Sequence, residues 1–469
     1  MDKALYELQA ISPIDGRYAK DTQSLSDIFS EAALINHRII IEGEYLIYLS
    51  EHGRIELEPF TLAEKTLVRD LYNPNLEDLI VVKEIETKGY KDIKRTNHDV
   101  KAVEYFLKDR LKDTPLEESL EWIHFCLTSE DVNNIAYAMM LRRGIEEIII
   151  PELTTVFDKI EEFAQKYKEI PMLARTHGQP ASPTTFGKEF KVYSSRLKRQ
   201  ITQLENSEIL VKLNGATGNY NALVAAYPDI PMGEFTESFI KRFNDQSWKI
   251  KLKPNFITTQ IEPHDSYAEI FDNLRRVNTI LMGFDQDIWR YISDDWIVQK
   301  PVEGEIGSST MPHKVNPIDF ENSEGNLGLA NALFNFFSSK LPISRLQRDL
   351  SDSTVERNFG VAFAHSLVAY KSTLKGLDKV SVNEYKVIKD LEEHPEVITE
   401  AIQTILKTDG FLMPYERLKE ITRGKKISMG ELHEFIEHLE VSDELKSVLK
   451  EITPSNYTGV AKYLVDIKI

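Results

Sequence analysis

The feature that most constrains the fold is a 29-residue amphipathic run from Tyr267 to Asp295. Its apolar residues recur at alternating spacings of four and three: Ile270, Leu274, Val277, Leu281, Phe284, Ile288 and Tyr291. Such spacing places the side chains on one face of an α-helix, in the pattern of helices that pack in bundles. A helix of this length extends roughly 43 Å. The chain therefore needs other long helices to cover this face.

Two further segments supply such helices. Pro151–Lys168 and Lys188–Leu213 both carry apolar residues at helical spacing, and a proline suits the first turn of the former. Residues that break helices are scarce, with 21 Gly and 19 Pro in 469 residues. No rhythm of alternating strands and helices is present. The sequence predicts an all-α fold with a central bundle of long helices, and its length suggests about three domains.

Charge and cysteine content exclude several classes of function. Lys and Arg number 57 against 75 Asp and Glu, so the formal net charge is −18, whereas nucleic-acid binders carry a basic domain or stripe. The single cysteine, Cys126, permits no internal disulfide and no thiolate cluster for a metal. The first residues lack the pattern of a leader peptide, and no apolar run is long enough to span a bilayer. We expect a cytoplasmic protein.

The loop Gly304–Pro317 is the strongest candidate for chemistry. It combines glycines and prolines with the hydroxyls of Ser308 and Ser309 and the cation of Lys314. Glycine lets backbone amides approach a ligand, hydroxyls can exchange protons, and an ammonium group binds carboxylate or phosphate. The alternative is a solvated connection between helices. The density of functional groups favours a site.

Histidines and arginines supply weaker signals. His177, in the segment RTHGQP, and His98, beside Asp99, could exchange protons near neutral pH, although a lone histidine is more often a surface or core residue. Histidine spacing fits no metal site, and no phosphate loop or dinucleotide fingerprint is present. Arg17 and the run Arg345–Arg357 suit an anion equally as well as ordinary salt bridges.

Several motifs together resemble one family. The segment GSSTMPHKVNP resembles the signature loop of the fumarase/aspartase superfamily. The segments SPIDGRY, RTNHDVKAVEYF, RTHGQPA, NGATGNYNA, TTQIEPHD and LQRDLSDST occur in the order typical of the bacterial type of adenylosuccinate lyase within that superfamily. The resemblance spans almost the whole chain. The signature loop points to the superfamily, and the flanking motifs point to the member.

This resemblance implies an all-α fold of three domains, which we expect at residues 1–112 (N-terminal helical domain), 113–364 (central bundle with the signature loop) and 365–469 (C-terminal helical domain). It implies a carbon–nitrogen lyase that releases fumarate from adenylosuccinate and from the succinylated aminoimidazole carboxamide ribotide SAICAR. It implies a homotetramer whose active sites are shared between subunits, and no cofactor, metal, nucleic acid or membrane partner.

Matching of motifs also implies residue roles. Ser308 would be the general base and His177 the general acid, Lys314 would stabilise developing negative charge, and His98 would orient the substrate or tune His177. The remaining implied substrate-binding residues are Arg17, Tyr18, Asn97, Asp99, Thr128, Ser129, Gln260, Ser309, Val315, Asn316, Asn322, Arg348, Ser353, Thr354, Val355, Glu356 and Arg357.

Two alternatives stay open. Another fumarate-releasing lyase of the superfamily, such as argininosuccinate lyase, would share the signature loop, but its substrate has no phosphate to occupy Arg17, Arg348 and Arg357. A catalytically silent structural homologue would have no need of His177, Ser308 and Lys314 in their motif positions.

Overall fold

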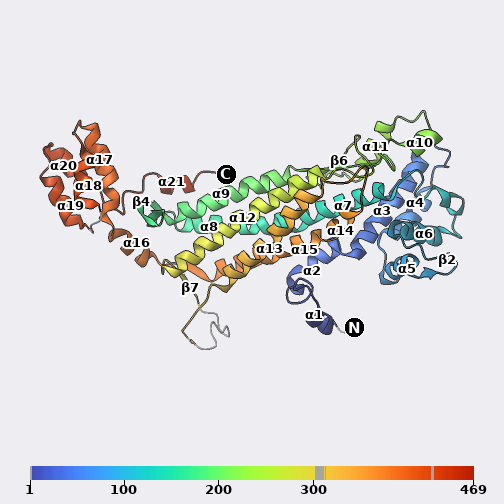
Figure 1. Ribbon diagram of the computed structural model, residues 1–469, viewed down its shortest axis with the longest axis horizontal. Coiled ribbons are helices and arrows are strands. Elements are labelled where there is room, and N and C mark those ends of the chain that lie inside the picture. Colours follow the sequence, from blue (N-terminus) through green and yellow to red (C-terminus); the bar gives the residue numbers. More distant parts are fainter. Residues whose placement is uncertain (1–2, 301–310, 312, 424–426) are drawn as a thin grey trace. The chain divides into compact units, whose positions relative to one another are not determined.

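The computed structural model describes residues 3–300, 311, 313–423 and 427–469. These residues form helices joined by short strands (Figure 1), so the prediction of an all-α fold is confirmed. The α-helices are α1 Lys3–Gln9, α2 Ala19–Phe29, α3 Glu31–Glu51, α4 Leu62–Arg69, α5 Leu76–Thr87, α6 Asp99–Leu111, α7 Ser129–Arg143, α8 Ile150–Lys166, α9 Phe186–Glu205, α10 Asn221–Ala226, α11 Met232–Lys241, α12 Asp265–Ser293, α13 Ile318–Lys340, α14 Ser351–Glu356, α15 Phe359–Asp378, α16 Glu384–Glu392, α17 Thr399–Thr408, α18 Pro414–Thr422, α19 Met429–Glu437, α20 Asp443–Lys450 and α21 Ala461–Val465.

Short helical turns and strands complete the described structure. A π-helical turn, η3 (Gly144–Ile149), leads directly into α8, and 3-10 turns lie at η1 Asp70–Tyr72, η2 Glu117–Trp122 and η4 Pro395–Ile398. The strands pair two by two: β1 Gly89–Tyr90 with β2 Ile93–Lys94, β3 Pro171–Thr176 with β4 Gln179–Thr185, β5 Glu208–Val211 with β6 Lys251–Pro254, and β7 Ile297–Gln299 with β8 Val380–Val382.

The long helices follow the predicted periodicity. The run predicted at Tyr267–Asp295 is α12, displaced by two residues and of the same length of 29 residues. Its seam residues are buried, from Ile270 through Phe284 to Ile288. The helix predicted at Pro151–Lys168 is α8, with its proline in the first turn. Apolar side chains at helical spacing therefore determined both helices, because only a helix brings them to one face.

The helix predicted over Lys188–Leu213 is wrong beyond residue 205. There α9 ends, and residues 208–211 form β5, which pairs in parallel with β6. Asn206 and Ser207 end the helix because their side chains donate to the carbonyls of Thr202 and Gln203, at 2.7 and 3.2 Å. The apolar residues that follow alternate in and out, as strand residues do.

The chain divides into two compact units. The first unit comprises residues 1–153, 200–279 and 326–369, and the second comprises residues 154–199, 280–325 and 370–469. The core of the first unit includes the rings of Phe271, Phe334, Phe337 and Phe359, with centroids 4.9 to 5.7 Å apart where Phe271 meets the others. In the second unit Phe190 of α9 packs against Phe163 of α8 and Phe284 of α12. The division into three domains stays a prediction.

Candidate active site

Three of the predicted residues, Asn97, His98 and Asp99, lie at the N-terminus of helix α6. Helix α6 starts after Asn97 and His98, and the Nδ1 atom of His98 accepts the backbone N–H of Lys101 at 3.3 Å. A ring nitrogen that accepts carries no proton, so the neutral ring has its proton on Nε2. That atom lies 3.3 Å from the hydroxyl of Ser129. Two segments that are 31 residues apart in sequence, both predicted to bind substrate, therefore meet at His98.

Asp99 is the centre of a group of cations. Its Oδ2 atom accepts from Arg38 at 2.7 Å and from Arg357 at 2.9 Å, and Arg357 also binds Glu31 at 2.6 Å. Burial raises the pKa of Asp99, but the charge of Arg38, the N–H of Val100 and the charge of Arg357 outweigh it and hold the pKa below its usual value. The carboxylate stays ionised and fixes the guanidinium groups.

The start of helix α7 is fixed from within the protein. Thr128 and Ser129 are partly exposed there, while Asp131 is fully buried and accepts the backbone N–H of Thr128 at 2.9 Å. The other oxygen of Asp131 lies 2.8 Å from the ammonium group of Lys212, which is equally buried. An ion pair without contact with water therefore sets the position of two predicted substrate contacts.

Arg348 connects a third segment of the first unit to the start of α7. This side chain contacts Gln260 at 3.4 Å and Glu130 at 3.0 Å, and it lies just before α14. In α14, Ser353 and Thr354 have access to solvent, whereas Val355 and Glu356 are buried. The helix period separates these pairs, so α14 can present hydroxyls to a ligand on one face while Glu356 faces the interior.

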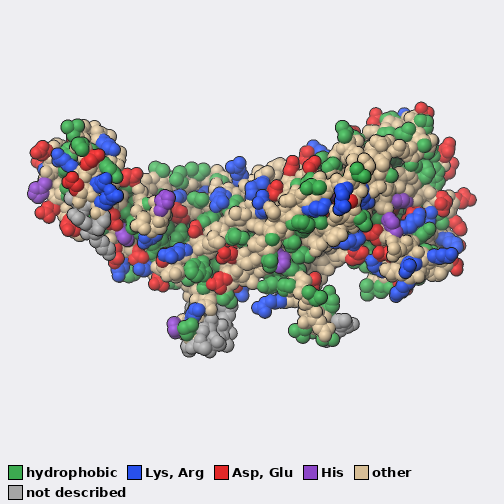
Figure 2. All heavy atoms as spheres, in the orientation of Figure 1, with side chains coloured by type: hydrophobic (Ala, Val, Ile, Leu, Met, Phe, Trp, Pro, Cys, Tyr) green, Lys and Arg blue, Asp and Glu red, His purple; other side chains and the backbone are tan. Residues whose placement is uncertain are grey.

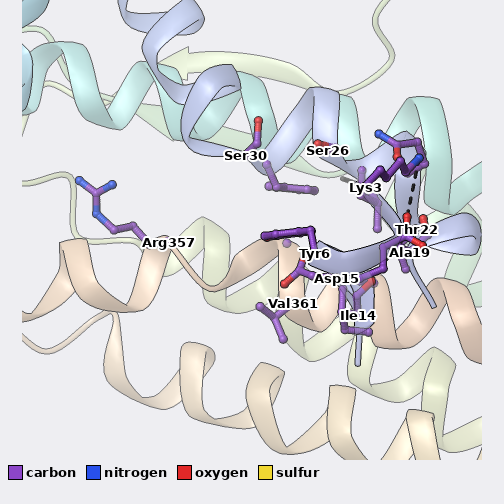
Figure 3. Close-up of a pocket in the computed structure, with 16 residues that line it drawn as sticks. Lys3, Tyr6, Ile14, Asp15, Ala19, Thr22, Ser26, Ser30, Arg357 and Val361 are labelled. Carbon is purple, nitrogen blue, oxygen red and sulfur yellow. Dashed lines mark hydrogen bonds and ion pairs between the residues drawn. The ribbon is translucent and has the colours of Figure 1, made fainter. Parts of the chain in front are cut away.

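The cavity that Arg357 borders is distinct from this cluster of hydroxyls. It measures about 320 Å³ and is lined by side chains of α1, α2, α15 and the loop between α1 and α2, among them Tyr6, Asp15 and Val361. Figure 3 shows Arg357 at one end, with its guanidinium directed away from Tyr6 and Asp15. The same guanidinium binds Asp99 and Glu31, so its charge serves the Asp99 group.

Arg17 and Tyr18 lie in the loop that precedes α2. Arg17 is exposed, and among the described residues no ion pair or side-chain hydrogen bond holds its guanidinium. Its predicted role in phosphate binding stays a prediction.

His177 occupies the turn of a β-hairpin in the second unit. Strands β3 and β4 pair from Pro171 with Thr185 to Thr176 with Gln179, and two residues connect them. Both adopt left-handed backbone, with φ of 53° at His177 and 74° at Gly178. Such φ values at both central positions define the tight turn that matches strand twist. They also hold the imidazole outward at the tip, where it is exposed in the single chain.

The signature loop is described only in part. Ser308 and Ser309 lie outside the described residues. Lys314 and Val315 are exposed, and the carbonyl of Val315 accepts from Gln299 of β7 at 3.0 Å. Asn322, in the first turns of α13, accepts from the hydroxyl of Ser372 at 2.8 Å.

Several residues that hold this site have no counterpart among the sequence predictions. They are Glu31, Arg38, Glu130, Asp131, Lys212 and His264. Arg38 and Lys212 gave a usable signal, because each lies within an apolar stretch, and a cation in such a position requires a buried partner. The acidic partners of these two cations lie far away in the sequence, so the sequence gave no signal for them.

The described residues contain no group of three or more His, Cys, Asp and Glu side chains placed to hold a metal ion. Nor do they include a helix long and apolar enough to cross a membrane. On the face that Figure 2 shows, Lys and Arg lie interspersed with Asp and Glu.

Comparison with known proteins covers almost the whole chain. Residues 16–331 match the family model described as "Lyase", and residues 344–458 match the model described as "Adenylosuccinate lyase C-terminal". The adenylosuccinate lyase of Vibrio cholerae is 48% identical over 465 residues, covering 98% of this chain and 99% of the relative. That of Haemophilus influenzae is 49% identical, with the same coverage.

Among solved structures, a fumarate lyase from Mesorhizobium sp. BNC1 has a TM-score of 0.71 at 17% identity, covering 95% of this chain and 96% of that chain. This likeness shows the shared fold. The two family models and the near-complete relatives agree with the resemblance of the motifs: this chain belongs to the adenylosuccinate lyase family of the fumarase/aspartase superfamily.

Proposed function

We propose that this protein cleaves adenylosuccinate to AMP and fumarate, and SAICAR to the free carboxamide ribotide and fumarate. The observation that carries the proposal is 48% identity over 98% of the chain to an adenylosuccinate lyase. The site supports it, because the substrate is a polyanion and the first unit holds the cations of Arg348 and Arg357 together with the hydroxyls of Ser129 and Ser353.

The reaction is a β-elimination. A base takes the proton from the carbon next to a carboxylate, the electron pair forms the carbon–carbon double bond of fumarate, and the carbon–nitrogen bond breaks. An acid gives its proton to the departing nitrogen. We assign the base to Ser308 and the acid to His177, with Lys314 stabilising the carboxylate that gains charge as the proton leaves.

His98 is an orienting residue in this scheme. Its Nδ1 is engaged by the backbone N–H of Lys101, so it can donate from Nε2 but cannot take up a second proton without losing that bond. It therefore suits a fixed donor to the substrate better than a shuttling acid. We keep the acid role with His177, whose ring is exposed.

The active form in this proposal is a homotetramer with composite sites in the cytoplasm. An exposed His177 supports it, since a general acid works best where water is excluded, and a neighbouring subunit can supply the cover. The exposed cation of Lys314 supports it in the same way.

The test is direct. Purified protein mixed with adenylosuccinate should lose the absorbance of the succinylated purine and release one AMP and one fumarate. Argininosuccinate serves as the control substrate; its cleavage without turnover of adenylosuccinate or SAICAR would refute the assignment. Ser308→Ala and His177→Ala should each lower kcat by about 100-fold or more while the assembly stays intact. A silent structural homologue would show no turnover of any of these substrates.

A further inference from the structure

Beneath the substrate segments of the first unit lies a group of charged side chains to which the proposed reaction assigns no chemical step. We call it the buried charge cluster: Glu130, His264, Arg348, Asp352 and Glu356. The side chains of His264 and Glu130 are 0% and 1% exposed, and Arg348, at 16%, is the most accessible. Burial of this many charges is costly unless they compensate one another.

Charge compensation within the cluster depends on His264. Arg348 lies 3.0 Å from Glu130 and 3.7 Å from Asp352, so one cation faces two carboxylates. The third carboxylate, Glu356, has the Nε2 atom of His264 at 3.3 Å. A neutral imidazole there would leave Glu356 without a cation of its own among the described residues.

The environment keeps this imidazole charged. Burial lowers the pKa of His264. Its contact with Glu356 and the charges of Glu356, Glu130 and Glu262 outweigh that effect and raise the pKa to about 9. Burial and the charge of Glu356 also raise the pKa of Glu130. The ring of Tyr267 also packs against His264, with 5.1 Å between the ring centroids.

Attraction between charges, rather than a complete set of hydrogen bonds, holds the cluster. Six of its buried polar atoms have no hydrogen-bond partner within the described residues: Glu130 Oε1, His264 Nδ1 and Nε2, Arg348 Nε, Asp352 Oδ2 and Glu356 Oε1. Unpaired buried polar atoms are rare in folded proteins and require an explanation. A requirement of function is one such explanation.

The backbone is bent to bring the imidazole inward. His264 has φ of 64°, in the left-handed region that costs energy for any residue other than glycine. Its N–H is held at 2.7 Å by Glu262, which in turn accepts from Asn255 at 3.0 Å. The bend lies four residues after Gln260, so the same segment carries a predicted substrate contact at one end and the cluster at the other.

We propose that His264, as an imidazolium, is a positioning residue of the substrate site: by neutralising Glu356 it joins the Gln260 segment, the Arg348–Arg357 segment and the start of α7. The proposal rests on the proposed function. His264 acts through Glu356 and Glu130 and does not touch the substrate. Loss of its charge would leave Glu356 unpaired, and Arg348 would be drawn away from Gln260 toward that carboxylate.

The experiment compares His264→Gln with the double variant His264→Gln/Glu356→Gln. The single variant should lower kcat/KM for adenylosuccinate by about tenfold or more, mainly through a higher KM, because it leaves a buried charge unpaired. The double variant should recover part of that loss, since it removes the unpaired charge, and Glu356 is itself only 2% exposed. Packing alone predicts the opposite, because two substitutions would then do more damage than one.

His365→Gln is the matched control. His365 is a buried histidine of the same unit whose Nδ1 contacts Asn326 at 2.8 Å, and among the described residues it forms no ion pair with a carboxylate. Its substitution should leave KM unchanged. Wild-type turnover, measured first, separates the two proposals: an inactive wild type refutes the proposed function, whereas an active wild type with an unaffected His264→Gln variant refutes the positioning role.

A pH series keeps the proposal testable if His264→Gln is too unstable to assay. KM of the wild type should rise as the pH passes about 9, where the imidazolium loses its proton, and this rise should be absent in the double variant. A wild-type KM that is constant across that range, or a double variant that folds but stays as impaired as the single variant, would overturn the positioning role.

Discussion

At the scale of single residues, burial decides which charged side chains affect the stability of the protein. Asp285 of α12 is buried beside Ser323 and Thr373, and its Oδ1 accepts from Thr373 at 3.3 Å. Burial raises the pKa of Asp285 well above its usual value, although the hydroxyls of Ser323 and Thr373 lower it in part. A carboxyl with a raised pKa in the folded state favours folding most at low pH. Its contribution declines as the pH rises above the unfolded value near 4.

Asp285→Asn should therefore stabilise the protein at pH 8 by about 1–2 kcal/mol, because an amide needs no proton to stay neutral. The gain should shrink toward pH 5. Thermal unfolding at matched protein concentration measures it. Asp272→Asn, on the same helix in an exposed pair with Arg275, should change stability by less than about 0.5 kcal/mol. A variant at Asp285 that is less stable than wild type at pH 8 would contradict this account.

Lys212 differs from Asp285, because its buried charge stabilises the fold. It lies 2.8 Å from Asp131 with both side chains fully buried, and it also donates to the carbonyl of Gly215 at 2.9 Å. Lys212→Met should cost about 3–5 kcal/mol, because Asp131 then stays buried without its cation. Denaturant unfolding measures the loss.

Lys249→Met is the matched control for that change. Lys249 pairs with Glu205 at 2.7 Å but is 64% exposed, so its removal should cost less than about 1 kcal/mol. Equal effects of the two substitutions would show that burial does not govern the Asp131 pair.

At the scale of elements, the β3–β4 hairpin shows how a turn presents a reactive group. His177 has left-handed backbone, which Asn adopts readily and β-branched residues resist. His177→Asn should leave the melting temperature unchanged while kcat falls by about 100-fold or more, because an amide cannot deliver a proton.

His177→Val tests the backbone part of this argument. It should lose activity to the same extent and also lower the melting temperature, since valine opposes the positive φ. If both variants melt at the wild-type temperature, the turn is not strained; if His177→Asn retains wild-type kcat, the imidazole is not the acid.

The helices themselves were predictable to different degrees. The seam of α12 has one interpretation, since seven apolar residues at spacings of three and four suit only a helix. The end of α9 was not predictable, because the four residues of β5 are too few for a period to distinguish strand from helix. Pairing with β6, about 40 residues later in the chain, decided the matter.

At the scale of the whole molecule, the residues proposed for one reaction are divided between the two units: His177 and Lys314 belong to the second unit, and Gln260 and Arg348 to the first. A shared active site predicts complementation. His177→Ala and Gln260→Ala should each have little activity alone, and tetramers assembled from a mixture of the two should regain a fraction of wild-type turnover, because some sites then combine intact residues from different subunits.

The mixture is formed by co-expression and assayed against each variant alone. A mixture of His177→Ala with His177→Asn is the control and should regain nothing. Turnover of the first mixture that merely equals the average of its two components would contradict composite sites that draw these two residues from different subunits.

The net charge is a property of the whole molecule. An excess of 18 negative charges argues against nucleic acid as a partner, yet the proposed substrate is itself an anion. Net charge describes the whole molecule, whereas cations can be placed locally: Arg38 and Arg357 converge on Asp99. The face that Figure 2 shows mixes both signs of charge.

The sequence alone determined the long helices, the family and the motif residues, because period and local motifs lie within short stretches of chain. Only the tertiary structure decided what holds those residues in place. Arg38 meets Asp99 across 61 positions, and His264 meets Glu356 across 92 positions. A lone His or Arg looks the same in sequence whether it is solvated or buried. Its charge becomes informative only when folding removes water and brings a distant carboxylate within about 3 Å.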